Sequence, residues 1–300
     1  MVHVTQRFLP EGRLLTTKEN RDACAGLDRL REAMEKGTIL EGLTLLCSPG
    51  HDLTVQVGEL TGHIPRDRAA LGIAEGTTRE IAILSRVGKA VCFTVESMDN
   101  GLLLSRRRAQ ERALAHILGT WKPGDVVPAT VTHLEPFGAF VDVGCGIPSM
   151  LSPEQISVSR ISHPKQRFSA GDEIFAVVTG IDREQGRVKL SHKALLGTWA
   201  ENAACFAPGM TVQGIVRGIK SYGVFVELAP NLTGLAEPCP GLCEEQRVSV
   251  YVKAIQPSRH KVKLVIIDRL PPAPPTKPRY FVTGGHLDEW RYLPEDPALW

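Results

Sequence analysis

Two segments of the sequence alternate apolar and polar side chains in the manner of a β-strand with one buried face. In the first segment, Ala139, Val141 and Val143 share one parity and are apolar. Phe140 and Asp142 share the other parity. Successive side chains of a strand point to opposite faces, so the first set should face a core and the second should face outward. The pattern therefore predicts an outward-pointing phenylalanine beside a carboxylate.

The second segment repeats this pattern. FGAFV at residues 137–141 recurs as YGVFV at residues 222–226, which is 85 residues later, and Phe225 and Glu227 take the outward positions. Each outward phenylalanine follows another aromatic residue, Phe137 or Tyr222, by three positions. A single outward phenylalanine is usually explained by packing under a loop. Its recurrence favours a ligand-binding role, since a planar ligand could reach both rings across the intervening glycine.

A fainter copy of the repeat lies upstream. Gly88 to Asp99 covers the same eleven-residue interval as Gly171 to Asp182, and both intervals enclose an apolar run. The upstream copy has Thr54 on the outward parity of its hairpin and no aromatic residue there. Repeats of this size with short alternating runs indicate small β-domains. We place three units near residues 37–106, 121–193 and 207–269.

The last strand of the first unit differs in composition from the last strands of the other two units. Arg187 and Lys189 alternate with aliphatic residues in the second unit, and Lys261 and Lys263 do so in the third. The first unit has only leucines at residues 102–104, so its aromatic residues and its cations are absent together. Aromatic rings that stack on bases, next to cations that meet phosphates, are typical of proteins that bind single-stranded nucleic acid. We therefore predict that the second and third units bind single-stranded RNA.

The motifs of the second unit resemble the S1 RNA-binding domain family. They are GDVV at 124–127, FGAFVDVG at 137–144, GDEI at 171–174 and GRVKLS at 186–191. The third unit matches through YGVFVEL at 222–228 and GLAE at 234–237. The resemblance implies a mainly β chain of three tandem five-stranded OB-fold barrels with short connecting helices. Three such repeats resemble the short ribosomal members of this family, found in the bacterial small subunit.

The resemblance also implies which residues contact RNA. The family uses two aromatic residues, a histidine near the third strand, and an aspartate and an arginine around the last turn. Ser152 stands at the histidine position of the second unit, while Glu237 and Gln256 stand at the histidine and aspartate positions of the third. The implied contacts, together with the lysines of the last strands, are Phe137, Phe140, Ser152, Asp182, Arg187, Lys189, Tyr222, Phe225, Lys261 and Lys263. A further candidate phosphate-binding loop contains His163, Lys165 and Arg167.

The first unit is expected to face a protein. His51 and Thr54 stand where the aromatic residues would be, and GHIP at 62–65 resembles the ribosome-docking repeats of the ribosomal members. We therefore expect contact with the small ribosomal subunit through residues 1–120.

Helical segments and a tail are expected around the three units. We predict one N-terminal helix within residues 1–36, opened by Thr16 and stopped by Gly37, and a helical linker at 107–120. A second linker spans 194–206. We predict that residues 270–300 form a Pro-rich spacer and an aromatic tail with a hairpin around Gly284-Gly285.

Composition narrows the class of protein. The chain is 43% hydrophobic and 23% charged, which is ordinary for a soluble protein, and its apolar runs fall short of a membrane span. The first residues lack a signal core. Seven cysteines without regular spacing do not form a disulfide framework, so a reducing cytoplasm is the expected location. We expect no metal, cofactor, small-molecule substrate or catalytic site, because no nucleophile, base or phosphate loop stands out.

Three functions remain open from the sequence. The first is a non-enzymatic protein of the ribosomal S1 type that captures mRNA for the small subunit in translation. The second is a regulatory or stress factor of the same domain family that binds RNA away from the ribosome. The third is a scaffold whose aromatic residues anchor a protein interface.

Overall fold

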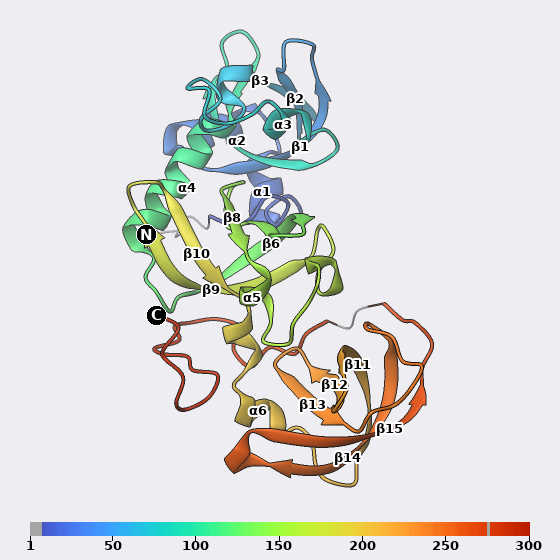
Figure 1. Ribbon diagram of the computed structural model, residues 1–300. Helices are drawn as coiled ribbons and strands as arrows, with labels where there is room; N and C mark the ends of the chain where they lie inside the picture. The colour runs from blue at the N-terminus through green and yellow to red at the C-terminus, as the bar shows by residue number, and fades with distance from the viewer. Residues whose placement is uncertain (1–7, 275–276) are drawn as a thin grey trace. The chain divides into compact units, whose positions relative to one another are not determined.

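The structure is a computed structural model that describes residues 8–274 and 277–300. Residues 1–7, where we predict no signal core, and 275–276, within the predicted spacer and tail, lie outside the described residues. The described chain is mainly β and contains three closed five-stranded barrels (Figure 1). The predicted fold class of three tandem OB-fold barrels with short helices is therefore confirmed. Among the described residues, no helix is both long and apolar enough to cross a membrane.

Barrel one has the strand order β1-β2-β3-β5-β4. The inward residues of its hairpin, Leu53, Val55 and Val57, are fully buried, as the alternation predicts. The helical pieces of this barrel are the 3-10 helix η1 (Arg66–Arg68) and α3 (Ile81–Leu84). Its strands are β1 (Leu40–Cys47), β2 (Leu53–Val57), β3 (Leu60–Ile64), β4 (Ala90–Ser97) and β5 (Leu102–Ser105).

Barrel two has the order β10-β8-β7-β6-β9, and its predicted inward residues Ala139 and Val141 are fully buried. It also holds α5 (Pro153–Ile156) and η2 (Pro164–Gln166). Its strands are β6 (Val126–Glu135), β7 (Gly138–Asp142), β8 (Pro148–Leu151), β9 (Glu173–Asp182) and β10 (Arg187–Ser191).

Barrel three has the order β11-β12-β13-β15-β14, and Val224 and Val226 are fully buried in its core. The short helix η4 (Pro257–Arg259) joins its last two strands. These strands are β11 (Thr211–Lys220), β12 (Gly223–Ala229), β13 (Leu232–Ala236), β14 (Arg247–Gln256) and β15 (Lys261–Arg269).

The N-terminal helical segment differs from the single helix that we predicted. It consists of α1 (Lys18–Ala23) and α2 (Leu27–Lys36), and the hydroxyl of Thr17, not Thr16, caps the first by accepting the N–H of Asn20. The chain leaves the helix just before Gly26, a residue of low helix propensity. Gly37 ends α2 in the left-handed conformation at φ 60°, as predicted.

The connections between barrels are short and helical. α4 (Arg106–Thr120) follows barrel one and begins at Ser105, whose hydroxyl accepts the N–H of Arg108. η3 (Lys193–Leu196) and α6 (Trp199–Ala203) follow barrel two. The Trp199 side chain is 5% exposed and packs in the core of barrel three, so this linker is fixed to the barrel that follows it.

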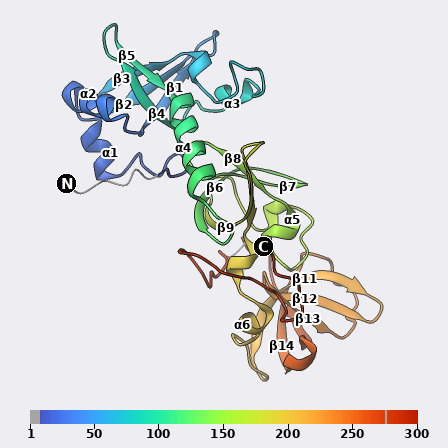
Figure 2. The same cartoon turned by 90° about the vertical axis from the view of Figure 1, so that its left-hand side faces the viewer.

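The chain forms two compact units. The first contains the chain up to residue 121 together with 128–130 and 142–148, and the second contains 122–127, 131–141 and 149–300. The described part of the tail, residues 277–300, contains no strand, so the predicted hairpin is wrong. The tail lies beside β9 in both views (Figures 1 and 2), where Tyr280 packs edge-on against Phe175 with 5.6 Å between ring centroids. Its aromatic residues are used for packing within the second unit.

Candidate nucleic-acid interface

Backbone pairing aligns four residues across the outer surface of barrel three. Gly218 of β11 pairs with Phe225 of β12, and Phe225 pairs with Leu235 of β13. Leu235 pairs in turn with Lys263 of β15. Residues that face each other across strands point to the same side of a sheet. We call these four residues the outer row of barrel three.

The outer row of barrel two contains the residues that lie 85 positions before Gly218, Phe225 and Leu235, together with the lysine that pairs with the last of them. These residues are His133 on β6, Phe140 on β7, Met150 on β8 and Lys189 on β10. The His133 ring stacks on the Phe140 ring with 4.1 Å between centroids and 9° between planes. Met150 pairs with Lys189 across the parallel strands. The second position of this row is a phenylalanine and the fourth is a lysine, as in the outer row of barrel three.

The outer row of barrel one has neither. Its residues, in the same strand order, are Leu46, Thr54, His63 and Leu103. Thr54 takes the phenylalanine position and Leu103 takes the lysine position. The sequence indicated that the first unit lacks both the aromatic ring and the cation. The structure shows that the two missing side chains belong to aligned positions on one surface of the barrel.

Each outer-row phenylalanine belongs to an L-shaped pair of rings. Phe137 and Phe140 lie 5.9 Å apart at 87°, and Tyr222 and Phe225 lie 6.1 Å apart at 87°. Phe137 is 59% exposed and Tyr222 is 65% exposed, whereas the outer-row phenylalanines are each partly exposed. Both rings of each pair can therefore be reached from solvent.

The glycine between the two rings is required by close packing of the strands. A Cβ added to Gly223 would lie 2.6 Å from the carbonyl oxygen of Ala236, and one added to Gly138 would lie 2.8 Å from that of Leu151. Real Cβ atoms do not approach backbone oxygens so closely. The glycine thus lets the hairpin lie flat on the next strand, with the two rings standing above it.

The cations predicted for this surface are exposed. Arg187, Lys189, Lys261 and Lys263 are all exposed on the last strands of their barrels. Arg187 pairs with Asp182 across the β9–β10 turn, and the Asp182 carboxylate accepts the N–H of Gln185 at 2.9 Å.

The histidine positions of the family carry different chemistry here. The Ser152 hydroxyl donates to the Glu154 carboxylate at 2.6 Å, so its hydrogen is already used within the chain. In barrel three Glu237 is exposed and lies 3.9 Å from the ammonium of Lys253. Neither residue offers the ring that the family has at this place.

The carboxylates that share parity with the phenylalanines are not solvated, contrary to our expectation. Asp142 and Glu227 are each 5% exposed. Glu227 Oε2 accepts from Arg217 Nε and from Arg167 Nη2, both at 2.6 Å. The alternation of side chains correctly predicted that these carboxylates point outward from the barrel. Other segments of the chain, however, cover the part of the strand on which they lie.

The predicted phosphate-binding loop is wrong for Arg167. Its side chain is 7% exposed and is ion-paired with Glu227 of barrel three, and burial lowers the pKa of its guanidinium. His163 caps η2 by accepting the N–H of Lys165, and the Lys165 side chain is exposed. This loop of barrel two therefore packs on barrel three, and Arg167 is not open to a phosphate in solution.

Asp142 lies in a buried ionic cluster of the first unit. Its carboxylate accepts the N–H groups of Glu11, Gly144 and Gly146 at 2.7, 2.8 and 3.0 Å. Burial raises the pKa of Asp142 to about 7, and the negative charge of Glu11 adds to the effect. Arg106 donates to Glu11 at 2.6 Å and holds its carboxylate in the cluster.

Two buried polar residues join barrel two, barrel three and the tail within the second unit. Asn231 accepts the N–H of Val158 and donates to the carbonyl oxygens of Lys193 and Gly197. The fully buried His192 ring lies 2.8 Å from the Ile156 carbonyl oxygen and 2.9 Å from the Tyr280 hydroxyl. Burial lowers the pKa of His192 to about 4. Sequence reasoning missed both residues, because a lone Asn or His carries no local signal of such contacts.

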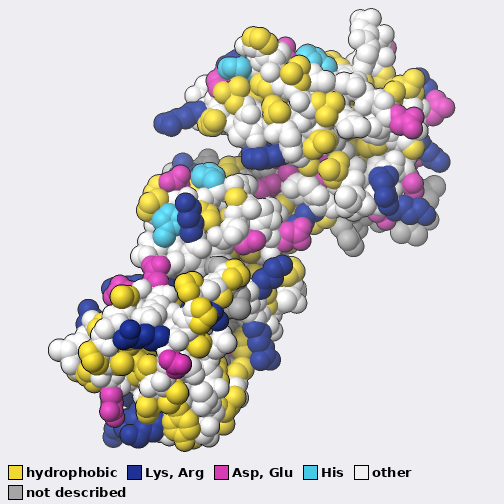
Figure 3. All heavy atoms as spheres, turned by 90° about the vertical axis from the view of Figure 1, so that its right-hand side faces the viewer, with side chains coloured by type: hydrophobic (Ala, Val, Ile, Leu, Met, Phe, Trp, Pro, Cys, Tyr) yellow, Lys and Arg dark blue, Asp and Glu magenta, His cyan; other side chains and the backbone are white. Residues whose placement is uncertain are grey.

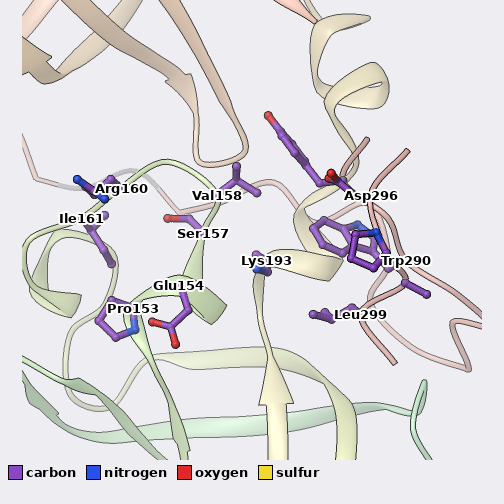
Figure 4. A pocket seen from close by; sticks show the side chains of 13 residues that line it. Pro153, Glu154, Ser157, Val158, Arg160, Ile161, Lys193, Trp290, Asp296 and Leu299 are labelled. Carbon is purple, nitrogen blue, oxygen red and sulfur yellow. The ribbon is translucent and has the colours of Figure 1, made fainter. Parts of the chain in front are cut away.

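A cavity of about 710 Å³ lies between α5, the loop that follows it and the tail (Figure 4). Two cations, Arg160 and Lys193, and two carboxylates, Glu154 and Asp296, line it. The Lys193 ammonium lies 5.9 Å from the centroid of the Trp290 ring. The opposite charges balance, so the lining does not favour a phosphate as the outer rows do.

Charge is spread over the surface. Lys and Arg side chains are scattered among acidic and uncharged ones on the face shown in Figure 3, and the net charge is +2. Any preference for RNA must therefore come from local placement of cations beside rings, since the whole-chain field is weak.

Barrel one exposes large apolar side chains on two neighbouring segments. They lie on β1 and on α3 with the turn after it. The Thr44 N–H donates to the Lys89 carbonyl oxygen and the Thr44 carbonyl oxygen accepts the Gly88 N–H, so these segments are joined. We call them the apolar patch of barrel one: Leu45 (47% exposed), Leu46 (56%), Ile81 (63%), Leu84 (45%) and Val87 (46%). Exposed apolar groups gathered in this way mark interaction surfaces.

Comparison with known proteins supports the resemblance drawn from the motifs. The family model described as "S1 RNA binding domain" matches residues 120–193. The small ribosomal subunit protein bS1 of Leuconostoc lactis is 30% identical over 254 residues, covering 78% of this chain and 58% of the relative. The bS1 protein of Streptococcus pneumoniae is 32% identical over 188 residues, covering 57% and 47%. The chain thus spans about half the length of these relatives.

A solved structure of a multidomain protein with nucleic acid binding domains from Streptococcus pneumoniae is 17% identical and covers 78% of this chain and 74% of its own. Its TM-score of 0.27 is too low to inform the fold. The chain carries an S1 RNA-binding domain at residues 120–193, and the resemblance inferred from its motifs is confirmed.

Proposed function

We propose that this chain is a non-catalytic protein that binds single-stranded RNA through the outer rows of barrels two and three and captures mRNA for the small ribosomal subunit in translation. One observation carries the RNA-binding part. The L-shaped ring pair recurs with nearly the same geometry in both barrels, 5.9 and 6.1 Å at 87°, and each row ends in an exposed lysine. Barrel one has the same strand order and lacks both features.

The chemistry of the row fits an unpaired nucleic acid. A base can stack on the exposed ring faces, and each such contact is worth about 1–3 kcal/mol. The lysine and arginine side chains of the last strand then meet the phosphates that flank the base. Because the outer rows of both barrels belong to one compact unit, binding at one raises the effective RNA concentration at the other.

RNA binding can be tested by removing one ring at a time. Phe140→Ala and Phe225→Ala should each weaken binding to an unstructured RNA by about 1–3 kcal/mol, measured by fluorescence anisotropy. The matched control is Thr54→Ala, a truncation at the same row position of barrel one, and it should leave binding unchanged. Unchanged affinity in both phenylalanine variants would remove the proposal. That outcome, with partner binding that does not respond to salt, is what the scaffold hypothesis predicts.

We further propose that residues 1–120 contact the small ribosomal subunit. The apolar patch of barrel one supports this assignment, since its five side chains are each at least 45% exposed and lie in the barrel without stacking rings. The names of the bS1 relatives point to the same partner.

Subunit docking has a separate test. Purified small subunits are sedimented with the full chain and with Leu46→Glu and Ile81→Glu variants. Both variants should lose co-sedimentation, since a charge would be buried at the contact. The control Phe140→Ala should still sediment in subunits that carry no mRNA. RNA binding without co-sedimentation of the parent chain would support the alternative of a factor that acts away from the ribosome.

A further inference from the structure

The outer rows of barrels two and three differ at their first position, which is His133 in one and Gly218 in the other. The phenylalanine next to this position has the same setting in both barrels, because each ring makes the same perpendicular contact with its partner ring. The ring face that lies toward the first strand can therefore be compared between the two barrels.

In barrel two this face is covered by the chain itself. The His133 imidazole lies parallel to Phe140, with 4.1 Å between centroids and 9° between planes. Such spacing is that of a stacked pair. The space beside the phenylalanine thus accepts a flat nitrogen heterocycle lying parallel to the ring.

In barrel three the first position of the row carries no side chain, because it is Gly218. A Cβ added to Gly218 would have one heavy atom within 4 Å, the Phe225 Cδ2 at 3.9 Å. The neighbouring Arg217 side chain is turned away, because it is 6% exposed and ion-paired with Glu227. The absence of a side chain at Gly218 leaves room beside Phe225 for a ring that the chain does not supply.

We infer that this space, between the Gly218 backbone and the Phe225 ring, is the binding site of an unpaired nucleobase, and that the His133 side chain occupies the corresponding space in barrel two. We call this space the seat of the base. The inference rests on the proposed RNA-binding function and assigns the two barrels unequal parts in it. Barrel three holds a base against the strand-side face of its phenylalanine. Barrel two holds RNA through the exposed Phe137, the part of the Phe140 ring that His133 leaves exposed, and its cations.

The first experiment fills the seat. Gly218→His is made in a Phe140→Ala background, so that stacking by barrel three dominates the measured affinity. The variant should bind an unstructured oligonucleotide about 5- to 150-fold more weakly, which is the loss of one stacked base. The matched control is Gly218→Ala, whose Cβ would lie at an ordinary contact distance and would leave the ring face open. It should bind as the background does.

The reciprocal experiment opens the seat in barrel two. His133→Ala in a Phe225→Ala background removes the imidazole and should tighten RNA binding by a factor within the same 5- to 150-fold range. Melting temperatures of all variants report whether they remain folded. Should Gly218→His fail to fold, the reciprocal variant carries the test alone.

The outcomes separate the inference from the function on which it rests. If Phe225→Ala weakens RNA binding while Gly218→His leaves it unchanged, the seat is elsewhere and the RNA-binding function stands. Weaker binding of His133→Ala would also overturn the inference, because the imidazole would then be a ligand contact. If neither the parent chain nor any variant binds RNA, the proposed function itself fails.

Discussion

Barrels one and three have the same strand order and the same pairing of four residues across their outer surfaces, yet those residues have different chemistry. Thr54 and Leu103 in barrel one stand where Phe225 and Lys263 stand in barrel three. The cores are built alike, with the inward residues of each hairpin fully buried. The barrel therefore supplies a set of positions, and the side chains at those positions decide whether the surface can bind RNA.

The carboxylates at the far end of the same strands extend this comparison. Asp142 and Glu227 follow the outer-row phenylalanines by two positions, and both are buried. Glu227 meets two guanidinium groups, whereas Asp142 lies near another acid, Glu11. Each of these two strands therefore has two roles. Its phenylalanine is presented to solvent, and the carboxylate two residues later is covered by another part of the chain.

The largest expected effect comes from breaking the carboxylate of barrel three. Glu227→Gln leaves Arg167 and Arg217 buried without a counter-charge, and it should lower the free energy of unfolding by about 3–5 kcal/mol. Asp142→Asn should cost less, about 1–3 kcal/mol, because it replaces the oxygen that accepts the Glu11 N–H but leaves no cation unpaired. Urea unfolding midpoints of the two variants measure the difference. Equal costs would show that the ion pairs of Glu227 contribute nothing beyond a hydrogen bond.

The second prediction concerns acid. The pKa of His192 is lowered from 6.5 to about 4, so the unfolded state binds more protons than the folded state between these values. The second unit should therefore lose stability as the pH falls through this range, by at most about 3 kcal/mol. The pKa of Asp142 is raised from 3.8 to about 7, so its contribution has the opposite sign and stability is lost as the pH rises from 3.8 to 7.

His192→Gln separates the two contributions, because it removes the group that titrates in the second unit and leaves Asp142 in place. When the pH falls from 6.5 to 4, urea unfolding should show that the variant loses less stability than the parent chain, or gains more, because the contribution of Asp142 remains. An unchanged pH dependence would mean that His192 is not the group responsible.

The sequence predicted the barrels and the rings because both follow from local rules. Parity of side chains along a strand identified the inward and outward residues, and the 85-residue repeat showed that the outward Phe140 recurs as Phe225. The structure confirms the barrels and places the predicted rings on their outer surfaces. The contact of these rings with RNA stays a prediction.

What covers an outward residue could not be predicted, because it depends on segments far away in the chain. Glu227 appeared solvated by parity, but Arg167 reaches it from a loop 60 residues earlier. The stacking of His133 on Phe140 depends on how two strands are aligned, and one sequence does not give that alignment. The N-terminal helix was placed one residue too early at Thr16 because Thr16 and Thr17 are both suitable caps.

A gain of function tests whether the outer row alone makes the difference between barrels. Thr54→Phe with Leu103→Lys is made in a chain that already carries Phe140→Ala and Phe225→Ala. RNA binding should recover by about 1–3 kcal/mol, the value of one stacked base. The control Gln56→Phe places a ring on the same strand and the same parity but outside the row, and it should recover nothing. Equal recovery in both variants would show that any exposed ring suffices.

The smallest expected effect concerns the lysines at the end of each row. Lys189→Gln and Lys263→Gln should each reduce the dependence of log affinity on log salt concentration by about 0.7, the value for one phosphate contact on a single strand. Leu103→Gln at the matched position of barrel one should not change this slope. The slope is more informative than the affinity, because it counts phosphate contacts and does not respond to lost stacking. A lower affinity with an unchanged slope in both lysine variants would mean that these side chains support the rings and do not contact phosphate.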